Sequence, residues 1–392
     1  MIAKVNIDRP SPLSRIGLRR VGRNSPASTL AVISTNTLSG VLARGRRGAR
    51  GRAGVSGERD LGSSLAMQAV VVHGPGGPEV LRIEERPIPD ARPGWVLVRV
   101  RAFGLNHSEL ITRAGGSGDA VRFPRVLGIE CVGEVVEAPG SDLQPGQRIV
   151  AAMGGMGRDY DGGYEQYTLL PASQAIPVET TLDWPQLGAI PESFGTAWGT
   201  LEELGLREGQ SLLVHGGSSS VGMAAITIAK DRGLTVLATT RQEAKRAALE
   251  AGGVEDPIVV DGDVTPAVRA LLPDGVDGLC ELVGPRAMVE ALHALAPGGR
   301  ACITGFLGGD WNTERAEAEA ERLEVQLRRF GSGVINRDSY GEVFQEIVQA
   351  VQDGHYRVNL DRVFPMSEIA DAHRYMQDNR AAGKVVVLPP ED

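Results

Sequence analysis

The sequence predicts an α/β protein in which a small antiparallel β-domain is combined with a doubly wound parallel sheet. Two observations lead to this prediction. Between residues 67 and about 190, short apolar runs are separated by Gly/Pro clusters such as "GPGGP", as in a barrel or sandwich of antiparallel strands. From Ser211 onward, apolar runs alternate with helix-like stretches, which is the rhythm of a parallel sheet with crossover helices.

Size and composition limit the class of protein. The chain has 392 residues, which at about 150 residues per domain predicts two or three domains. Its 42% hydrophobic and 23% charged residues are ordinary for a soluble globular protein, and no apolar run approaches the ~18 residues needed to cross a bilayer. Three dispersed cysteines form neither a disulfide framework nor a zinc knuckle, which predicts a reducing, cytoplasmic location.

Residues 1–66 are expected to be a disordered basic extension, because they hold twelve Lys or Arg, three acidic residues and no aromatic. Three explanations compete for this segment. A nucleic-acid-binding arm is disfavoured because no aromatic is interleaved to stack on bases. An organellar transit peptide fits the Arg- and Ser-rich, acid-poor composition. We favour a start codon placed too far upstream, because a clear strand begins at Met67.

The individual elements follow in order along the chain. Strands are expected at 68–73, 79–86, 95–102, 131–137 and 164–170, each bounded by turn residues. A helix begins near Pro191, and six apolar strands then alternate with helices up to about residue 333: "SLLVH", "LTVLATT", "PIVV", "GLCELV", "RACITGF" and "EVQLRRF". An amphipathic helix is expected over 338–352, and the final strand, "GKVVVL", is expected to rejoin the first domain.

The stretch 211–233, "SLLVHGGSSSVGMAAITIAKDRG", carries the strongest chemical signal. An apolar strand runs into a Gly/Ser turn and a helix begins at once, so backbone N–H groups and the helix dipole converge on one spot that suits a diphosphate. Ser219 stands where the G-x-G-x-x-G pattern has its middle glycine, and a tight connection without a ligand is the alternative. The expected diphosphate contacts are Gly217, Ser218, Ser219, Ser220, Val221 and Gly222.

The end of the next strand indicates which dinucleotide is bound. An NAD site has an Asp or Glu about twenty residues after the loop, where it holds the ribose 2′-hydroxyl. Here the strand ends at Thr240 and is followed by Arg241 and Lys245, two cations placed for a 2′-phosphate. We therefore expect NADP(H), with these three residues as contacts. The alternative is that the two cations form a solvated helix face.

The order of the motifs resembles the medium-chain dehydrogenase/reductase superfamily, in particular its zinc-independent quinone oxidoreductase branch. The motifs are "MQAVVVHGPGGPEVL", "VRVRAFGLNHSEL", "FPRVLGIECVGEVVE", "PGQRIVA", "GGYEQYTLLPA", "VHGGSSSVGMAAITIAKDRG", "LAPGGRACITG" and "DAHRYMQDNRAAGKVVV", so the resemblance runs from Met67 nearly to the C-terminus. It implies a GroES-like catalytic domain made of residues 67–190 and 334–392 around a Rossmann NADP-binding domain at 191–333. It also implies a cofactor in the cleft between them, and a homodimer.

The same resemblance leads us to expect no metal. Zinc alcohol dehydrogenases of the superfamily carry a ligand Cys where this chain has Asn106, and a ligand His where it has Ile129. A catalytic zinc needs three protein ligands, and Cys131 lies about 6.6 Å further along the strand than Ile129. The alternative is an alcohol dehydrogenase with rearranged ligands, for instance His107, Glu109 and Glu130.

Asn106 and His107 are the candidate catalytic residues. In zinc-free relatives the matching Asn lies beside the nicotinamide, where its amide can donate to a substrate carbonyl or to the cofactor. Capping the helix that starts near His107 is a compatible role for Asn106. His107 is a candidate proton relay or phosphate contact, with a surface or packing role as the alternative. The branch often has a Tyr where this chain has Ile111, which leaves Tyr160 and Tyr164 to reach the cleft or to pack in the core.

The reaction implied by the resemblance is hydride transfer from NADPH to a quinone or an α,β-unsaturated carbonyl compound, with oriented donors stabilising the developing oxyanion. A non-catalytic NADPH-binding relative is the alternative from another class of protein. The expected partner is a small-molecule carbonyl or quinone, with no nucleic acid and no membrane. Further cofactor contacts implied by the resemblance, each with packing as the alternative, are Thr196, Val283, Gly284, Phe306, Leu307 and Lys384.

Overall fold

A computed structural model describes residues 65–307 and 312–391 of the chain. All of them belong to one of the two units into which the chain divides, Asp60–Asp392. The basic extension expected at residues 1–66 lies outside the described residues except for Leu65 and Ala66, and Ala66 is the first residue of β1. Within the described ranges, no helix is long and apolar enough to cross a membrane.

Two sheets form the β-region that the turn-separated apolar runs predict. In the smaller sheet, β1 (Ala66–Val72) pairs antiparallel with β2 (Arg82–Pro87) and with β4 (Arg125–Val126). Residues Pro78–Val80 form a 3-10 turn, so the strand expected over 79–86 begins only at Arg82. The larger sheet has the order β15-β16-β3-β5-β6-β8, with β7 paired to β3. Its strands are β3 (Trp95–Gly104), β5 (Glu130–Glu137), β6 (Arg148–Ala152), β7 (Tyr167–Pro171), β8 (Ile176–Pro177), β15 (Leu360–Pro365) and β16 (Lys384–Leu388).

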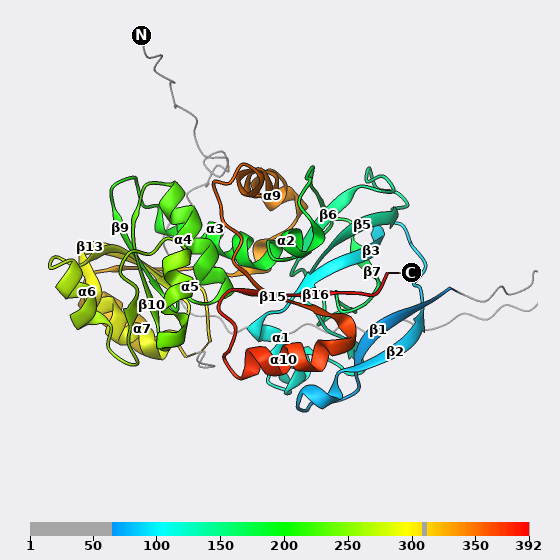
Figure 1. Cartoon of the computed structure of the whole chain (residues 1–392), viewed down its shortest axis with the longest axis horizontal. Helices are drawn as coiled ribbons and strands as arrows, with labels where there is room; N and C mark the ends of the chain where they lie inside the picture. Colours follow the sequence, from blue (N-terminus) through cyan, green and yellow to red (C-terminus); the bar gives the residue numbers. More distant parts are fainter. Residues whose placement is uncertain (1–64, 308–311, 392) are drawn as a thin grey trace, which may run out of the picture. The chain divides into compact units, whose positions relative to one another are not determined.

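The last strand of the chain lies in the middle of this larger sheet. β16 is hydrogen-bonded in parallel to β15 and in antiparallel to β3, with Val386 opposite Gly104. Figure 1 shows β16, in red, beside β3, in cyan, although the two are separated by most of the sequence. The C-terminal segment therefore returns to the sheet that holds β3, β5, β6, β7 and β8.

The remaining strands form the parallel doubly wound sheet that the sequence predicts. Their order is β11-β10-β9-β12-β13-β14, and every neighbouring pair is parallel. The order reverses between β9 and β12, which places a crevice at the carboxyl ends of these two strands. The strands are β9 (Ser211–His215), β10 (Thr235–Thr240), β11 (Ile258–Val259), β12 (Val276–Glu281), β13 (Leu295–Ile303) and β14 (Gln326–Arg329).

Helices cover both faces of the parallel sheet and connect it to the larger β-sheet. The amphipathic helix expected at 338–352 is α9 (Arg337–Gln352). The other helices are α1 (His107–Arg113), α2 (Trp184–Gly188), α3 (Pro191–Leu204), α4 (Ser220–Asp231), α5 (Arg246–Ala251), α6 (Thr265–Leu271), α7 (Pro285–Ala291), α8 (Glu314–Arg322) and α10 (Ile369–Gln377). Short 3-10 turns lie at Gly118–Ala120, Glu243–Lys245, Leu292–Ala294, Ser332–Val334 and Met366–Glu368.

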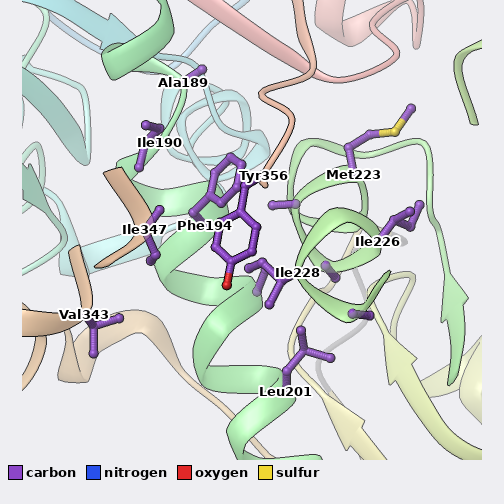
Figure 2. Packing of buried hydrophobic residues seen from close by; sticks show 14 of the residues in the cluster. Ala189, Ile190, Phe194, Leu201, Met223, Ile226, Ile228, Val343, Ile347 and Tyr356 are labelled. Atoms are coloured by element: carbon purple, nitrogen blue, oxygen red, sulfur yellow. The ribbon is translucent and has the colours of Figure 1, made fainter. Parts of the chain in front are cut away.

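One hydrophobic cluster joins the two kinds of sheet. It contains Ala102 and Val132 of the larger β-sheet together with side chains of α3, α4 and α9. In Figure 2 the rings of Phe194 on α3 and Tyr356 lie against each other, with centroids 6.2 Å apart, among aliphatic side chains of α4 and α9. Burial of this apolar surface fixes the residues between β3 and α1 relative to the carboxyl ends of β9 and β12.

Candidate functional site

A cavity of about 1120 Å³ opens at the carboxyl ends of the parallel strands. Its walls come from the loop after β9, the ends of β10 and β12, the start of α1, and the segment after α10. In open α/β sheets, ligands bind in this crevice where the strand order reverses. The position of the cavity is therefore the one expected for a dinucleotide.

The loop after β9 owes its shape to glycine and to one serine hydroxyl. Gly216 has φ +89°, a conformation that a residue with a Cβ rarely adopts. A Cβ on Gly222 would lie 2.6 Å from the carbonyl oxygen of Gly217, so only glycine lets the first turn of α4 approach the loop. Ser219, in the middle glycine slot, is the N-cap of α4: its Oγ accepts the N–H of Gly222 at 3.1 Å and donates to the carbonyl of Gly216 at 2.8 Å.

The serine at this position therefore supports the turn rather than blocking it. Ser218, Ser219 and Ser220 all line the cavity, at the N-terminal end of a twelve-residue helix. The dipole of such a helix favours an anion at this end. Gly383 forms an isolated β-bridge with Ser219 and also lines the cavity, so the C-terminal segment lies against the loop.

Cations gather where β10 ends. Arg241 is exposed on the cavity wall, and among the described residues no carboxylate forms an ion pair with it. Lys245 is buried, and its Nζ donates to the side-chain oxygen of Asn379 at 2.9 Å. Burial lowers the pKa of Lys245, partly offset by the charge of Asp361. Thr240 is fixed beside the loop, with its Oγ1 3.2 Å from Ser218 Oγ.

A buried polar network lies behind another part of the wall, next to Leu105, His107 and Gly383, which line the cavity. Lys384 donates from Nζ to Asn106 Oδ1 at 2.7 Å and forms an ion pair with Glu130. Asn106 in turn donates from Nδ2 to Glu130 Oε1 at 2.8 Å. Its second amide contact, to Glu109 Oε1, is longer at 3.4 Å, so one amide hydrogen is held only weakly.

Asn106 is also the N-cap residue of α1, one of the two roles expected for it. The Glu109 carboxylate accepts the backbone N–H of Asn106 at 3.0 Å and that of Ile129 at 2.9 Å. These bonds hold the start of α1 against the strand that begins at Glu130. His107 consequently projects from a fixed helix start onto the cavity wall, and burial lowers its pKa.

Glu192, near the start of α3, continues the network. Its backbone N–H donates to Glu130 Oε2 at 2.8 Å, and its Oε1 accepts the hydroxyl of Thr196 at 3.0 Å. Its Oε2 is buried without a hydrogen-bond partner in the described part of the chain. Burial, reinforced by the charge of Glu130, raises the pKa of Glu192 to about 7. No sequence pattern had pointed to Glu192.

The structure brings most, but not all, of the expected site residues to the cavity. Those that line it are His107, Ser218, Ser219, Ser220, Thr240, Arg241, Lys245, Val283, Gly284 and Leu307. Those that lie outside its lining are Asn106, Thr196, Gly217, Val221, Gly222, Phe306 and Lys384. In this second group Lys384 is only 2% exposed, because its ammonium is used inside the polar network. Phe306 packs against the core around Leu279.

The two tyrosines considered for the cleft are packing residues. Tyr164 is completely buried, stacks on Phe103 with centroids 4.6 Å apart, and places its hydroxyl 3.1 Å from His373 Nε2. Tyr160 packs edge-on against Trp95. Neither lines the cavity.

Several lining residues could not be predicted from the sequence, because their position at the cavity depends on residues far away in the chain. His215 precedes the glycine loop, and its importance depends on a partner 66 residues away. Met376 lies in the last turn of α10 and Asn379 follows that helix, far from the loop in sequence. A positive φ of +55° at Asn379 is a turn feature that Asn tolerates, but a lone Asn carries no such signal in a sequence.

Two family models match the chain. The alcohol dehydrogenase GroES-like domain matches residues 92–180, and the zinc-binding dehydrogenase model matches residues 254–387. The synaptic vesicle membrane protein VAT-1 homolog of Rattus norvegicus is 26% identical over 346 residues, which cover 82% of this chain and 84% of that protein. The quinone oxidoreductase of Rattus norvegicus is 28% identical over 331 residues, covering 82% of this chain and 98% of that protein. Among solved structures, an NAD-dependent alcohol dehydrogenase is similar with a TM-score of 0.73 and 29% identity, covering 82% of this chain and 99% of that one.

The description of the second family model implies zinc, and the side chains present do not fit it. Zinc requires three or four N, S or carboxylate ligands converging on one point. Nowhere in residues 65–307 and 312–391 do three His, Cys, Asp or Glu side chains form such a group. In the rearranged set considered above, Glu130 is paired with Lys384 and Glu109 accepts two backbone N–H groups, so His107 gains no co-ligands.

Proposed function

Because this chain belongs to the medium-chain dehydrogenase/reductase superfamily, in its quinone oxidoreductase-like branch, and is an oxidoreductase, we propose that it reduces small quinones or α,β-unsaturated carbonyl compounds with NADPH and without a metal. The observation that carries the proposal is the composition of the cavity wall. A helix N-terminus lies at one part of the wall and two cations lie at the end of β10, where an NAD site would have a carboxylate.

The preference for NADPH rests on Arg241 and Lys245. A 2′-phosphate adds about two negative charges and three acceptor oxygens, which a guanidinium and an ammonium satisfy with charge-assisted bonds. Arg241 is exposed on the wall and pairs with no described carboxylate, so it is available for this phosphate. The solved alcohol dehydrogenase that this chain resembles is NAD-dependent, so similarity to that protein does not support NADPH. The support comes from Arg241 and Lys245.

At the substrate end, the cofactor supplies a hydride, and the chain's own residues orient the substrate and its developing charge. We assign the oxyanion contact to Asn106, which lies directly behind the lining residues Leu105 and His107 and whose second amide hydrogen has only a 3.4 Å contact to Glu109. Lys384 keeps the Asn106 amide in this orientation, because it donates to the amide oxygen and leaves the amide nitrogen as the donor. Val283 and Leu307 form an apolar part of the wall, against which we propose that the nicotinamide ring packs.

The proposal includes the domain boundaries, with residues 67–190 and 334–392 as the catalytic domain and 191–333 as the NADP-binding domain. It also includes the remaining expected cofactor contacts, a homodimer and a cytoplasmic location. The larger β-sheet, which holds strands from both ends of the described chain, supports this division into domains.

The test is NADPH consumption by the purified chain over a panel of quinones and enones, with zinc content measured in the same preparation. We expect turnover with at least one substrate class and substoichiometric zinc. A requirement for stoichiometric zinc would instead indicate an alcohol dehydrogenase with rearranged ligands. NADPH binding without oxidation by any member of the panel would indicate a non-catalytic relative.

A further inference from the structure

A histidine and a glutamate form a pair at the end of two neighbouring strands, beside the phosphate loop. His215 is the last residue of β9, and Glu281, the last residue of β12, is opposite it in the parallel register. Their side chains meet, with His215 Nδ1 2.7 Å from Glu281 Oε2. His215 is 8% exposed and lines the cavity, whereas Glu281 is completely buried.

Donors surround the Glu281 carboxylate. Its second oxygen accepts the backbone N–H of Val283 at 2.7 Å and that of Gly284 at 3.0 Å. Together with the contact to His215, these bonds fix the position of the carboxylate. The same bonds identify Nδ1 of His215 as the protonated nitrogen facing it. Val283 and Gly284 also line the cavity, so the glutamate orders this part of the wall as well as the imidazole.

The other imidazole nitrogen is available to a ligand. Nε2 of His215 has no hydrogen-bond partner among the described residues, and the ring lies in the same cavity as Ser218, Ser219 and Ser220. Burial lowers the pKa of His215, but the charge of Glu281 and its hydrogen bond, together with Glu290, outweigh burial and raise it. The charged or titratable groups that line the same cavity are Arg286 and Glu290 on α7, Asp261 after β11, Arg241 and Lys245 after β10, and His107 on α1.

On the premise that the chain uses NADPH, we propose that His215 is a further cofactor-binding residue. Its imidazolium, paired with Glu281, donates from Nε2 to the phosphates of the cofactor. It would add a charged donor at the end of β9 to the helix dipole of α4 and to the two cations after β10. A hydrogen bond to a charged group corresponds to about a tenfold to hundredfold change in affinity. Because only the imidazolium carries this charge, its contribution is present at low pH and is lost as the pH rises through the titration of His215.

The experiment compares NADPH dissociation constants from pH 5.5 to 8.5 for the wild-type chain and His215→Gln, which keeps an N–H donor without a charge. The 2′-phosphate titrates near pH 6 by itself, so the ratio between the two proteins at each pH is decisive. We expect His215→Gln to bind NADPH about tenfold to a hundredfold more weakly at pH 5.5, and the ratio to fall steadily toward pH 8.5. His355→Gln, at an exposed histidine paired with Asp231, is the matched control and should follow the wild type.

A second measurement on the wild-type chain keeps the proposal testable if His215→Gln does not fold. Calorimetric titration of NADPH in two buffers with different ionisation heats at pH 7.5, above the titration of the 2′-phosphate, should reveal proton uptake on binding. A pH-independent ratio, or binding at pH 7.5 without proton uptake, would overturn the assignment of His215 while leaving NADPH binding intact. No NADPH binding at any pH would overturn the proposed cofactor and this inference together.

Discussion

The replacement Lys384→Met tests whether the buried network behind the cavity wall holds the proposed active-site residue Asn106 in place. Lys384 and Glu130 are 2% and 0% exposed, and the ammonium is shared between Glu130 and the Asn106 amide. Methionine matches the length of the lysine stem but leaves the Glu130 carboxylate buried without its counter-ion. Removing one partner of a buried ion pair costs about 3–5 kcal/mol, because the remaining charge keeps its desolvation penalty.

For a chain of this size, a loss of about 3–5 kcal/mol corresponds to a fall in Tm of about 6–10 °C, at about 2 °C per kcal/mol. Urea unfolding followed by circular dichroism would give the free energy directly. The double variant Lys384→Met/Glu130→Gln should recover at least half of the loss, because it removes the orphaned charge. Gly104→Ala is an independent probe, since its Cβ would collide with the side chains of Lys384 and Glu130.

Arg374→Met is the matched control, because Arg374 pairs with Asp371 on the surface, where the two side chains are 50% and 64% exposed. A surface pair contributes about 0–1 kcal/mol, so this variant should unfold close to the wild type. A loss below about 1 kcal/mol for Lys384→Met, or equal losses for the single and double variants, would refute the buried ion pair as the element that fixes Asn106.

Two further predictions concern the loop and the buried glutamate. Gly222→Ala should lower the free energy of unfolding by about 1–3 kcal/mol and weaken NADPH binding, because its Cβ would lie 2.6 Å from a loop carbonyl. Its control, Gly341→Ala, has open space in α9 and should raise the free energy of unfolding by about 0.5–1 kcal/mol. Equal unfolding free energies for the two variants would contradict this prediction. Burial raises the pKa of Glu192 from 4.5 to about 7, so the folded chain holds an extra proton between these values and loses stability as the pH rises through them. The free energy of unfolding of Glu192→Gln, measured in urea relative to the wild type, should therefore rise by about 2–3 kcal/mol from pH 5 to pH 8. The same difference between the two proteins at both pH values would count against a buried titrating carboxyl.

Local signals in the sequence predicted the fold and the loop well. The strand–glycine–helix pattern from Ser211 predicted β9, the turn and α4, because all its determinants lie within about twenty residues of each other. The alternation of apolar runs with helices predicted the parallel sheet, since each crossover must bury its own apolar face. For Ser219 the sequence predicted a diphosphate contact. It did not predict that the hydroxyl of this serine would cap the first turn of α4.

Pairings across long stretches of sequence could not be read in advance. Lys384 is expected at the cofactor from its place in the sequence, whereas its ion pair with Glu130, 254 residues away, is seen only in the structure. His215 and Glu281 become a pair only through the register of β9 and β12, which depends on the packing of the whole sheet. In both cases the sequence shows the charged residue, but only the fold shows which oppositely charged residue pairs with it.

The most direct test of the proposed cofactor is a titration of NADPH and NADH with the wild-type chain, Arg241→Ala and Arg246→Ala. Arg246 is the matched control, because it is a half-buried arginine five residues further along that pairs with Glu243. We expect the wild type and Arg246→Ala to bind NADPH at least about tenfold more tightly than NADH. Arg241→Ala should lose most of that preference, with its NADH affinity unchanged. Equal affinities for the two coenzymes in the wild type, or an undiminished preference in Arg241→Ala, would contradict the proposed cofactor.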